Sequence, residues 1–386
     1  MMSGPHQPLS KFRIVDLTRV LSGPFCSMLL ADLGANVIKV EAPEGDPVRA
    51  QGAGREGLSW YFASFNRNKR SIVIDLKTQE GRAVLEQLIG RADALIENFR
   101  PGVLDRLGFT QARLDELRPG LITCSISGFG AHGPYRDRPA FDFIAQAMSG
   151  FMSVNGRADD PPLRTGLPIS DLVAGLYGAF GVTAALLRRE QTGQGERIDV
   201  SLTNSMISLL AYTASHYFAT GEVLPRTGND HPIASPYGLF RTRDGEIAIA
   251  PSDNTFFARL VDVLGLPELK QDPDLADNPL RVRHRSRLTA LVEEKLVQQD
   301  SAHWIAALNG AGVPCGPVYG VDGVFADPQV QNQEMAIEVD HPGHGTVRTI
   351  GFPIKFSQAP CQVTRPAPDL GQHTDEILTE IGWEPQ

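Results

Sequence analysis

The first half of the chain alternates short apolar runs with amphipathic stretches, and this alternation restricts the possible folds most strongly. The amphipathic stretches include 25–33 and 79–89. Five runs have the length and composition of buried strands: 12–17, 36–41, 71–76, 94–97 and 121–126. Apolar strands that alternate with helices are typical of a parallel sheet covered on both faces. The sequence therefore predicts an α/β fold, with ligands beyond the carboxyl ends of the strands.

The size and charge of the chain exclude several classes of function. The length of 386 residues exceeds one ordinary core, so two domains are expected. The net charge of -9 argues against nucleic acid or an anionic membrane as the main partner, and no apolar run is expected to approach the length of a membrane span. The first residues lack the regions of a signal peptide, and the four cysteines form no CxxC pair. A cytoplasmic protein is expected.

The pattern of predicted elements in the sequence changes near Pro225 and again after about residue 325. The stretch 225–325 is rich in loops, contains a hairpin that turns at Asp244 and Gly245, and then shows three helical patterns. We interpret it as a smaller α+β domain, whose basic run 281–287 is expected to be a solvated helix face, with a partial role in binding phosphates as the alternative. Residues 1–224 then form the N-terminal part of a large Rossmann-like domain, with a long apolar helix predicted from 202 to about 217. Residues 326–386 return to that domain and contain two candidate strands, 336–340 and 345–350.

Asp171 lies in a short turn that leads into a helix of small residues, 166–181. A carboxylate there would lie at the positive end of the helix, which favours the ionised form, and glycines nearby would expose it to a ligand. An ionised aspartate can attack an activated acyl group. The alternative is that Asp171 only caps the helix.

Several segments at the predicted strand ends would suit an anionic, nucleotide-like ligand. They offer cations for phosphates, small residues for close backbone approach and aromatic rings for a base. The segments are 21–24, 39–41, 66–70, 75–77, 98–102, Arg106 and 125–130. The run with Arg67, Lys69 and Arg70 could equally be a solvated charge run, and Phe99 could be core. No GxGxxG or P-loop pattern occurs, so the ligand stays open at this point.

The ordered set of motifs resembles the class III CoA-transferases, the family of formyl-CoA and carnitine CoA-transferases. The resemblance is carried by 16–24, 30–41, 66–71, 97–102, 107–109 and the Asp171 segment, and it continues through 231–232, 236–237, 244–245, 278–283, 312–317, 327–329 and 371–374. It covers nearly the whole chain.

The resemblance implies a Rossmann-like large domain, a smaller α+β domain and a homodimer of two interlocked rings. It implies that Asp171 is the catalytic residue and that coenzyme A is a substrate, with no tightly bound cofactor and no metal. The residues expected to contact coenzyme A are Leu21, Ser22, Lys39, Asp75, Lys77, Asn98, Phe99, Arg100 and Arg106, with Ser127 added from its place at a strand end.

The implied reaction moves coenzyme A between two carboxylic acids. The Asp171 carboxylate would attack an acyl-CoA thioester to give a mixed anhydride, and the released thiolate would return to form an aspartyl-CoA thioester. Amides in the turn from Gly128 to Gly130 are candidates to stabilise the oxyanion. The small domain and tail most resemble the branch of the family that uses succinyl-CoA as donor and a dicarboxylate as acceptor, so this pair of substrates is expected.

Two other functions stay open. An α-methylacyl-CoA racemase would share the fold but needs a histidine before the catalytic aspartate, where this chain has Phe141. A catalytically silent CoA-binding protein would share the binding residues and leave Asp171 unmodified.

Overall fold

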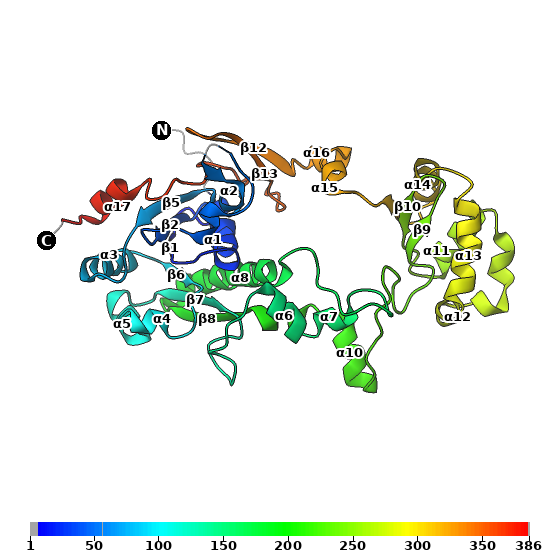
Figure 1. Cartoon of the computed structure of the whole chain (residues 1–386), viewed down its shortest axis with the longest axis horizontal. Coiled ribbons are helices and arrows are strands. Elements are labelled where there is room, and N and C mark those ends of the chain that lie inside the picture. Colours follow the sequence, from blue (N-terminus) through cyan, green and yellow to red (C-terminus); the bar gives the residue numbers. More distant parts are fainter. Residues whose placement is uncertain (1–6, 56, 385–386) are drawn as a thin grey trace. The chain divides into compact units, whose positions relative to one another are not determined.

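The computed structural model describes residues 7–55 and 57–384 (Figure 1). The described residues form two compact units. The larger takes in those up to Ser149, Thr165–Leu209 and those from Pro328 onward, and the smaller takes in Gly150–Arg164 and Leu210–Asp327. The borders thus fall after Leu209 and Asp327, where the sequence placed them after 224 and 325. Residues 1–6 and 385–386, which belong to the predicted segments 1–224 and 326–386, lie outside the described residues. The prediction that the N-terminus lacks the regions of a signal peptide falls partly on residues 1–6.

The larger unit is built on a six-stranded parallel sheet, which confirms the predicted α/β fold. Its strand order is β5-β2-β1-β6-β7-β8. β1 pairs with both β2 and β6, so the chain changes direction across the sheet between β1 and β6. Open α/β sheets bind ligands at such a switch point, outside the carboxyl ends of the strands. The strands are β1 (Arg13–Asp16), β2 (Asn36–Glu41), β5 (Lys69–Val73), β6 (Ala94–Glu97), β7 (Ile122–Ser127) and β8 (Glu196–Ser201).

Helices cover both faces of this sheet, because neighbouring strand residues point to opposite sides. Ile14 packs with residues of α1 and α8, whereas Val15 packs with residues of α3 and α17. α17, in red in Figure 1, returns the end of the chain to β5 and α3. The helices of the larger unit are α1 (Ser22–Asp32), α2 (Trp60–Asn66), α3 (Gln79–Ile89), α4 (Val103–Arg106), α5 (Gln111–Leu117), α6 (Asp142–Met148), α8 (Ile169–Thr192), α9 (Leu202–Ser208), α16 (Pro328–Asn332) and α17 (Thr374–Ile381).

α8 packs closely on α1 because small residues line the contact. A Cβ atom on Gly175 would lie 2.7 Å from the Ser22 carbonyl oxygen, and one on Gly178 would lie 2.9 Å from Cys26 Sγ. By length and composition alone α8 could cross a membrane, so the expectation that no run reaches that length is wrong for this helix. About half of its apolar window is buried in the unit, as in the core helix of a globular domain.

The cations of the 66–70 run are buried, so the expectation of a solvated charge run is wrong. Arg67 pairs with Asp32 at 2.7 Å, and Lys69 pairs with Asp16 at 3.2 Å. Arg70 contacts two carboxylates of α17. These ion pairs tie β5 to α1, β1 and the C-terminal helix, and none of the three cations is left for a phosphate.

Two short hairpins complete the larger unit. β12 (Ala336–His341) pairs with β13 (Gly345–Ile350), as the sequence predicts, and β3 (Gly54–Arg55) pairs with β4 (Leu58–Ser59). A 3-10 turn, η1 (Pro47–Ala50), follows β2.

The smaller unit contains a three-stranded antiparallel sheet in the order β11-β10-β9. The predicted hairpin is confirmed, because β9 (Gly238–Arg241) pairs with β10 (Glu246–Ile249). The other elements are α7 (Phe151–Val154), α10 (Ala211–Thr220), α11 (Asn254–Val263), η2 (Pro267–Gln271), η3 (Pro273–Leu275), α12 (Asn278–Arg283), α13 (Arg285–Leu296), α14 (Ser301–Gly310), β11 (Cys315–Pro317) and α15 (Val321–Val324).

Two features of the chain after residue 201 differ from the prediction. The single helix expected from 202 to 217 is two helices, α9 and α10, because Ala211 has a φ of 44° and interrupts the helical path. Arg281, expected on a solvated helix face, is 1% exposed and donates to the carbonyl oxygens of Ser235 and Leu275. Buried carbonyl groups, rather than water, satisfy its guanidinium.

Candidate active site

Loops at the carboxyl ends of β1, β6 and β7 surround a pocket of about 200 Å³ beside the start of α8. The pocket lies at the sheet's switch point, where a ligand site is expected. Seven of the residues that the sequence predicted line it: Leu21, Ser22, Asn98, Phe99, Arg100, Ser127 and Asp171.

Asp171 lies in the first turn of α8 but does not cap it. The N-cap residue is Pro168, which supplies no side-chain hydrogen bond. The Ser170 amide and hydroxyl instead donate to Asp142 Oδ1, both at 2.9 Å. Asp142 therefore satisfies the helix terminus from α6, and the alternative interpretation of Asp171 as a cap is wrong. The Asp171 carboxylate lines the pocket.

The electrostatic surroundings of Asp171 also differ from the prediction. Burial first, and then the nearby Asp142 carboxylate, raise the pKa of Asp171 to about 7, although a hydrogen bond from Ser22 opposes the rise. Desolvation and a like charge thus outweigh the helix dipole, which favours the ionised form by about 0.3–1 kcal/mol. The carboxyl is half-buried and only partly ionised at neutral pH, rather than exposed and fully ionised.

The loops after β1 and β6 hold each other through one side-chain amide. Asn98 Nδ2 donates to the Arg19 carbonyl oxygen at 2.8 Å, and Asn98 Oδ1 accepts from the Arg19 amide at 3.0 Å. The Asn98 amide is therefore occupied by the backbone of the other loop. In a binding site the Asn98 side chain would hold the loop 19–22 in place beside the loop 98–101.

Three guanidinium groups of the pocket were missed by the sequence reasoning: Arg19, Arg136 and Arg138. With Arg100 they give the pocket four arginines among its lining residues, together with one aspartate, Asp171. The Arg138 guanidinium stacks 3.7 Å from the centre of the Tyr135 ring. The charged segment 135–138 follows β7 and was a usable signal, because a loop after a strand of this sheet must lie near the carboxyl edge.

A second pocket of about 230 Å³ adjoins the first, and Phe99 lines both. It brings together Lys39, Asp75 and Lys77. Asp75 Oδ1 accepts from the Lys77 amide at 2.9 Å and so shapes the turn, while the Lys77 side chain is exposed. Arg106 is exposed on α4 and lines neither pocket.

Lys39 does not offer the free cation that was predicted. Its side chain is 0% exposed, and Nζ lies 2.9 Å from both Asp46 Oδ2 and the Thr18 carbonyl oxygen. A phosphate could reach this ammonium only by breaking a buried ion pair, which is unfavourable. Lys39 therefore stabilises the loops that form the pocket and does not bind the ligand directly.

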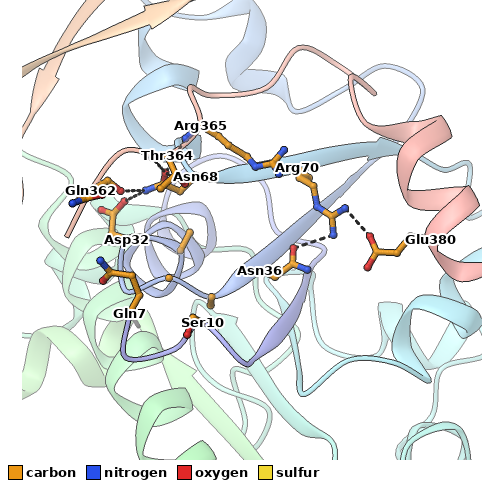
Figure 2. A pocket seen from close by; sticks show the side chains of 13 residues that line it. Gln7, Ser10, Asp32, Asn36, Asn68, Arg70, Gln362, Thr364, Arg365 and Glu380 are labelled. Atoms are coloured by element: carbon orange, nitrogen blue, oxygen red, sulfur yellow. Dashed lines mark hydrogen bonds and ion pairs between the residues drawn. The ribbon is translucent and has the colours of Figure 1, made fainter. Parts of the chain in front are cut away.

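A larger pocket of about 400 Å³ lies at the amino ends of β2 and β5, away from these loops (Figure 2). Arg70 lines it, but its guanidinium already contacts Asn36 and Glu380. Asp32 is likewise paired, with Arg67 and Asn68. The polar groups of this pocket serve the fold, and it contains neither Asp171 nor the strand-end loops.

Two other predicted features fall near Asp171. Gly128 lines the first pocket, and its carbonyl oxygen accepts from the Thr203 amide and hydroxyl. The Gly130 amide donates to the Ser127 hydroxyl at 3.1 Å, so it is not available to an oxyanion. Phe141, where a racemase would carry a histidine, is 76% exposed and lines the pocket. Over 7–55 and 57–384, no group of three His, Cys, Asp or Glu side chains could hold a metal ion.

Comparison with known proteins agrees with this geometry. The family model described as CoA-transferase family III matches residues 9–374. The human succinyl-CoA:glutarate CoA-transferase is 38% identical over 97% of this chain and 86% of its own length. The acetyl-CoA:oxalate CoA-transferase of Acetobacter aceti is 40% identical over 98% of this chain and 96% of its own. The crystal structure of a CAIB/BAIF family protein from Brucella suis superposes with a TM-score of 0.87 and 40% identity, covering 97% of this chain and all of that one.

Proposed function

Since this chain belongs to CoA-transferase family III and is an enzyme that transfers coenzyme A, we propose that Asp171 accepts the acyl group and then coenzyme A covalently. The observation that carries this proposal is the position of the Asp171 carboxylate in one pocket with the loops after β1, β6 and β7. A carboxyl with a pKa of about 7 is ionised in a large fraction of molecules at neutral pH, as a nucleophile must be.

In the proposed reaction each step forms one acyl bond and breaks another. The Asp171 carboxylate attacks the thioester carbonyl, which gives a mixed anhydride and releases the CoA thiolate. The thiolate attacks the aspartyl carbonyl, which gives an aspartyl-CoA thioester and releases the donor acid. The acceptor carboxylate then attacks this thioester, and the thiolate finally attacks the acceptor's carbonyl of the new anhydride. Asp171 returns as a carboxylate, and no redox change occurs.

The charges of the pocket support a polyanionic ligand and a dicarboxylate acceptor. Four arginines and one aspartate line the pocket, a surplus of cations that suits the phosphates of coenzyme A and a second carboxylate on the acyl group. Relatives are named for succinyl-CoA or acetyl-CoA as donor, and for glutarate or oxalate as acceptor. Both named acceptors are dicarboxylic acids. We therefore propose succinyl-CoA as donor and a dicarboxylate as acceptor.

A screen of acids tests the acceptor class. The enzyme is incubated with succinyl-CoA and, separately, oxalate, malonate, glutarate, mesaconate, butyrate and hexanoate, and new acyl-CoA species are identified by mass spectrometry. We expect kcat/KM for the best dicarboxylate to exceed that of the monocarboxylate of matched length by at least about 10-fold, since a hydrogen bond between charged groups contributes about 1.5–3 kcal/mol. Equal rates for glutarate and butyrate would contradict the dicarboxylate proposal and leave CoA transfer itself intact.

We also propose that two copies of the chain associate, in the interlocked form that the family resemblance implies. Large apolar side chains remain exposed on α8 within the larger unit, including Leu176, Phe180 at 73% and Leu187 at 64%. A contiguous apolar face of this kind is typical of a protein interface. Light scattering is expected to give the mass of two chains, and Phe180→Asp should lower that mass or the yield of soluble protein. A parent protein with the mass of one chain would contradict the proposal.

A further inference from the structure

The backbone at Val20 adopts a conformation that a valine rarely takes. Its φ is 70°, in the left-handed region, where the branched Cβ of valine crowds the backbone. Residues held in such regions persist only where their surroundings hold them, and they concentrate at functional sites. Val20 lies between Arg19 and Leu21, in the loop that lines the pocket of Asp171.

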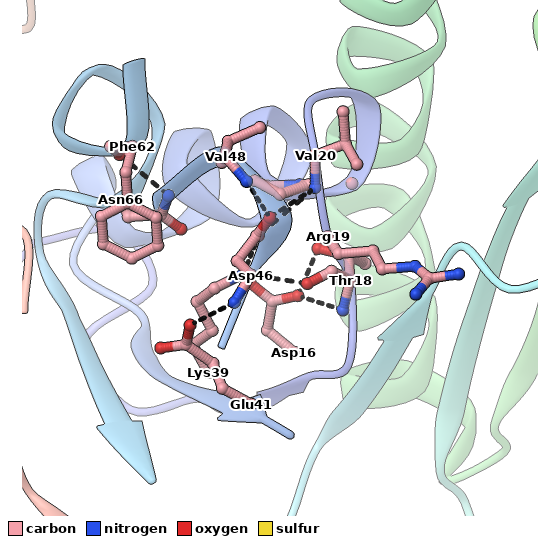
Figure 3. A network of polar contacts seen from close by, with 12 residues as sticks. Asp16, Thr18, Arg19, Val20, Lys39, Glu41, Asp46, Val48, Phe62 and Asn66 are labelled. Carbon is pink, nitrogen blue, oxygen red and sulfur yellow. Dashed lines mark hydrogen bonds and ion pairs between the residues drawn. The ribbon is translucent and has the colours of Figure 1, made fainter. Parts of the chain in front are cut away.

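Asp46 is the group that holds the Val20 backbone. Its carboxylate accepts from the Val20 amide, at 3.1 Å to Oδ1 and 3.3 Å to Oδ2, and Oδ1 also accepts from the Val48 amide (Figure 3). Oδ2 pairs with the buried Lys39 ammonium at 2.9 Å. The Asp46 backbone is fixed in turn, because its amide donates to Glu41 Oε2 at 3.0 Å.

The residues on either side of Val20 are held as well. Lys39 Nζ also donates to the Thr18 carbonyl oxygen, and the Thr18 amide donates to Asp16 Oδ1 at 2.9 Å. On the far side Leu21 is the N-cap residue of α1, and the next residue, Ser22, lines the pocket together with Asp171 and lowers the pKa of that carboxyl by a hydrogen bond. A change in the path at Val20 would therefore displace Ser22 relative to the Asp171 carboxylate.

We propose that Asp46 is a positioning residue of the transfer reaction, which fixes Val20 in its left-handed conformation and thereby sets Ser22 against Asp171. This inference rests on the proposed role of Asp171. Lys39 contacts Asp46 Oδ2 and orients the carboxylate, so a buried ion pair outside the reacting groups defines the geometry of the loop. The cost of the Val20 conformation is offset by the hydrogen bond of the Val20 amide, shared between both Asp46 oxygens, and by packing of the Val20 side chain beside Val48 and Phe62.

The test separates the acceptor function of Asp46 from its charge. Lys39→Met with Asp46→Asn, the Asn pair, removes the ion pair and keeps an acceptor oxygen for the Val20 amide. Lys39→Met with Asp46→Leu, the Leu pair, removes the acceptor as well. Neither pair of substitutions leaves a Lys39 or Asp46 charge buried without its partner. We expect kcat for CoA transfer to be about 5- to 30-fold lower in the Leu pair than in the Asn pair, the fold-change for one or two kcal/mol of lost conformational preference.

A third substitution, Val20→Gly, decides between positioning and mere stability. Glycine adopts a positive φ without strain, so the difference between the Leu and Asn pairs should shrink to less than about threefold in that background. A purely structural role of Asp46 predicts no such rescue. Asp32→Leu with Arg67→Met serves as the control, because it removes a buried ion pair of the same unit that does not contact the loop.

Hydrogen exchange gives a readout that does not depend on turnover. The peptide that contains the amides of 20–22 should exchange at least about tenfold faster in the Leu pair than in the Asn pair or the control, since the Val20 amide loses its acceptor. Unchanged exchange and equal kcat in the Leu and Asn pairs would overturn the inference. A parent that exchanges slowly but transfers no coenzyme A would instead contradict the proposed function.

Discussion

Asp171→Asn is expected to lower the turnover of CoA transfer by about 10³- to 10⁶-fold, the range found when the nucleophile of a covalent mechanism is removed. An amide cannot form the mixed anhydride, whereas its shape still fits the pocket. Binding of coenzyme A, measured by calorimetry, should stay within a few-fold of the parent. Turnover is measured as new acyl-CoA with succinyl-CoA as donor. Retained turnover in the variant would remove Asp171 from the mechanism.

A stability measurement shows whether this variant is folded and tests the electrostatics of the site. The pKa of Asp171 is about 7 in the folded protein and ordinarily 3.8. Between these values the folded state binds more protons than the unfolded state, so the parent loses stability as the pH rises from about 4 to 7. Asparagine does not titrate. The advantage of Asp171→Asn in free energy of unfolding should therefore grow by on the order of 1–3 kcal/mol from pH 5 to pH 8.

Urea unfolding at the two pH values checks this difference, with Asp105→Asn as the control. Asp105 is exposed on α4, so its replacement should change stability little at either pH. An advantage of Asp171→Asn that is equal at pH 5 and pH 8 would contradict a raised pKa at this site.

Lys69→Met is expected to lower the free energy of unfolding by about 3–5 kcal/mol, the cost of leaving one partner of a buried ion pair unpaired. Lys69 is 0% exposed, and Nζ contacts Asp16 at 3.2 Å, the Pro24 carbonyl oxygen at 3.0 Å and Asn66 Oδ1 at 2.9 Å. Burial lowers the pKa of Lys69 to about 8, so the ammonium is mostly charged at pH 7. Its loss leaves the Asp16 carboxylate without its partner.

Chemical denaturation at pH 7 measures this cost against an exposed pair. Arg113→Met breaks the surface contacts of Arg113 with Glu86, at 2.9 Å, and with Glu116, at 3.1 Å, and should change stability little. Lys69→Met with Asp16→Asn should recover much of the loss, since no buried charge remains unpaired. If Lys69→Met cost no more than Arg113→Met, the ion pair would not be part of the structural core.

The sequence predicted the sheet well because its strands are short apolar runs between helical patterns. The strand at 94–97 has the same bounds in the structure. The pocket residues followed, because the carboxyl ends of parallel strands meet at one edge, and Ser22, Asn98 and Ser127 each follow or end such a strand.

The sequence could not predict which charged side chains pair with one another, because these ion pairs join segments that are distant in the chain. Lys39 and the 66–70 cations look like phosphate ligands by position, yet Asp46, Asp32 and Asp16 pair with them. The raised pKa of Asp171 depends on burial and on Asp142, which lies 29 residues earlier in the chain. The sequence around Ala211 contains no glycine or proline that would have predicted the interruption between α9 and α10.

The most direct test of the account is to find the covalent adduct. The enzyme is mixed with succinyl-CoA, treated with hydroxylamine and digested, and the peptides are mapped by mass spectrometry. An aspartyl thioester or anhydride reacts with hydroxylamine, so the account predicts a hydroxamate on Asp171 in the parent and none in Asp171→Asn. A hydroxamate on another residue, or an unmodified Asp171 in an enzyme that still transfers coenzyme A, would contradict it.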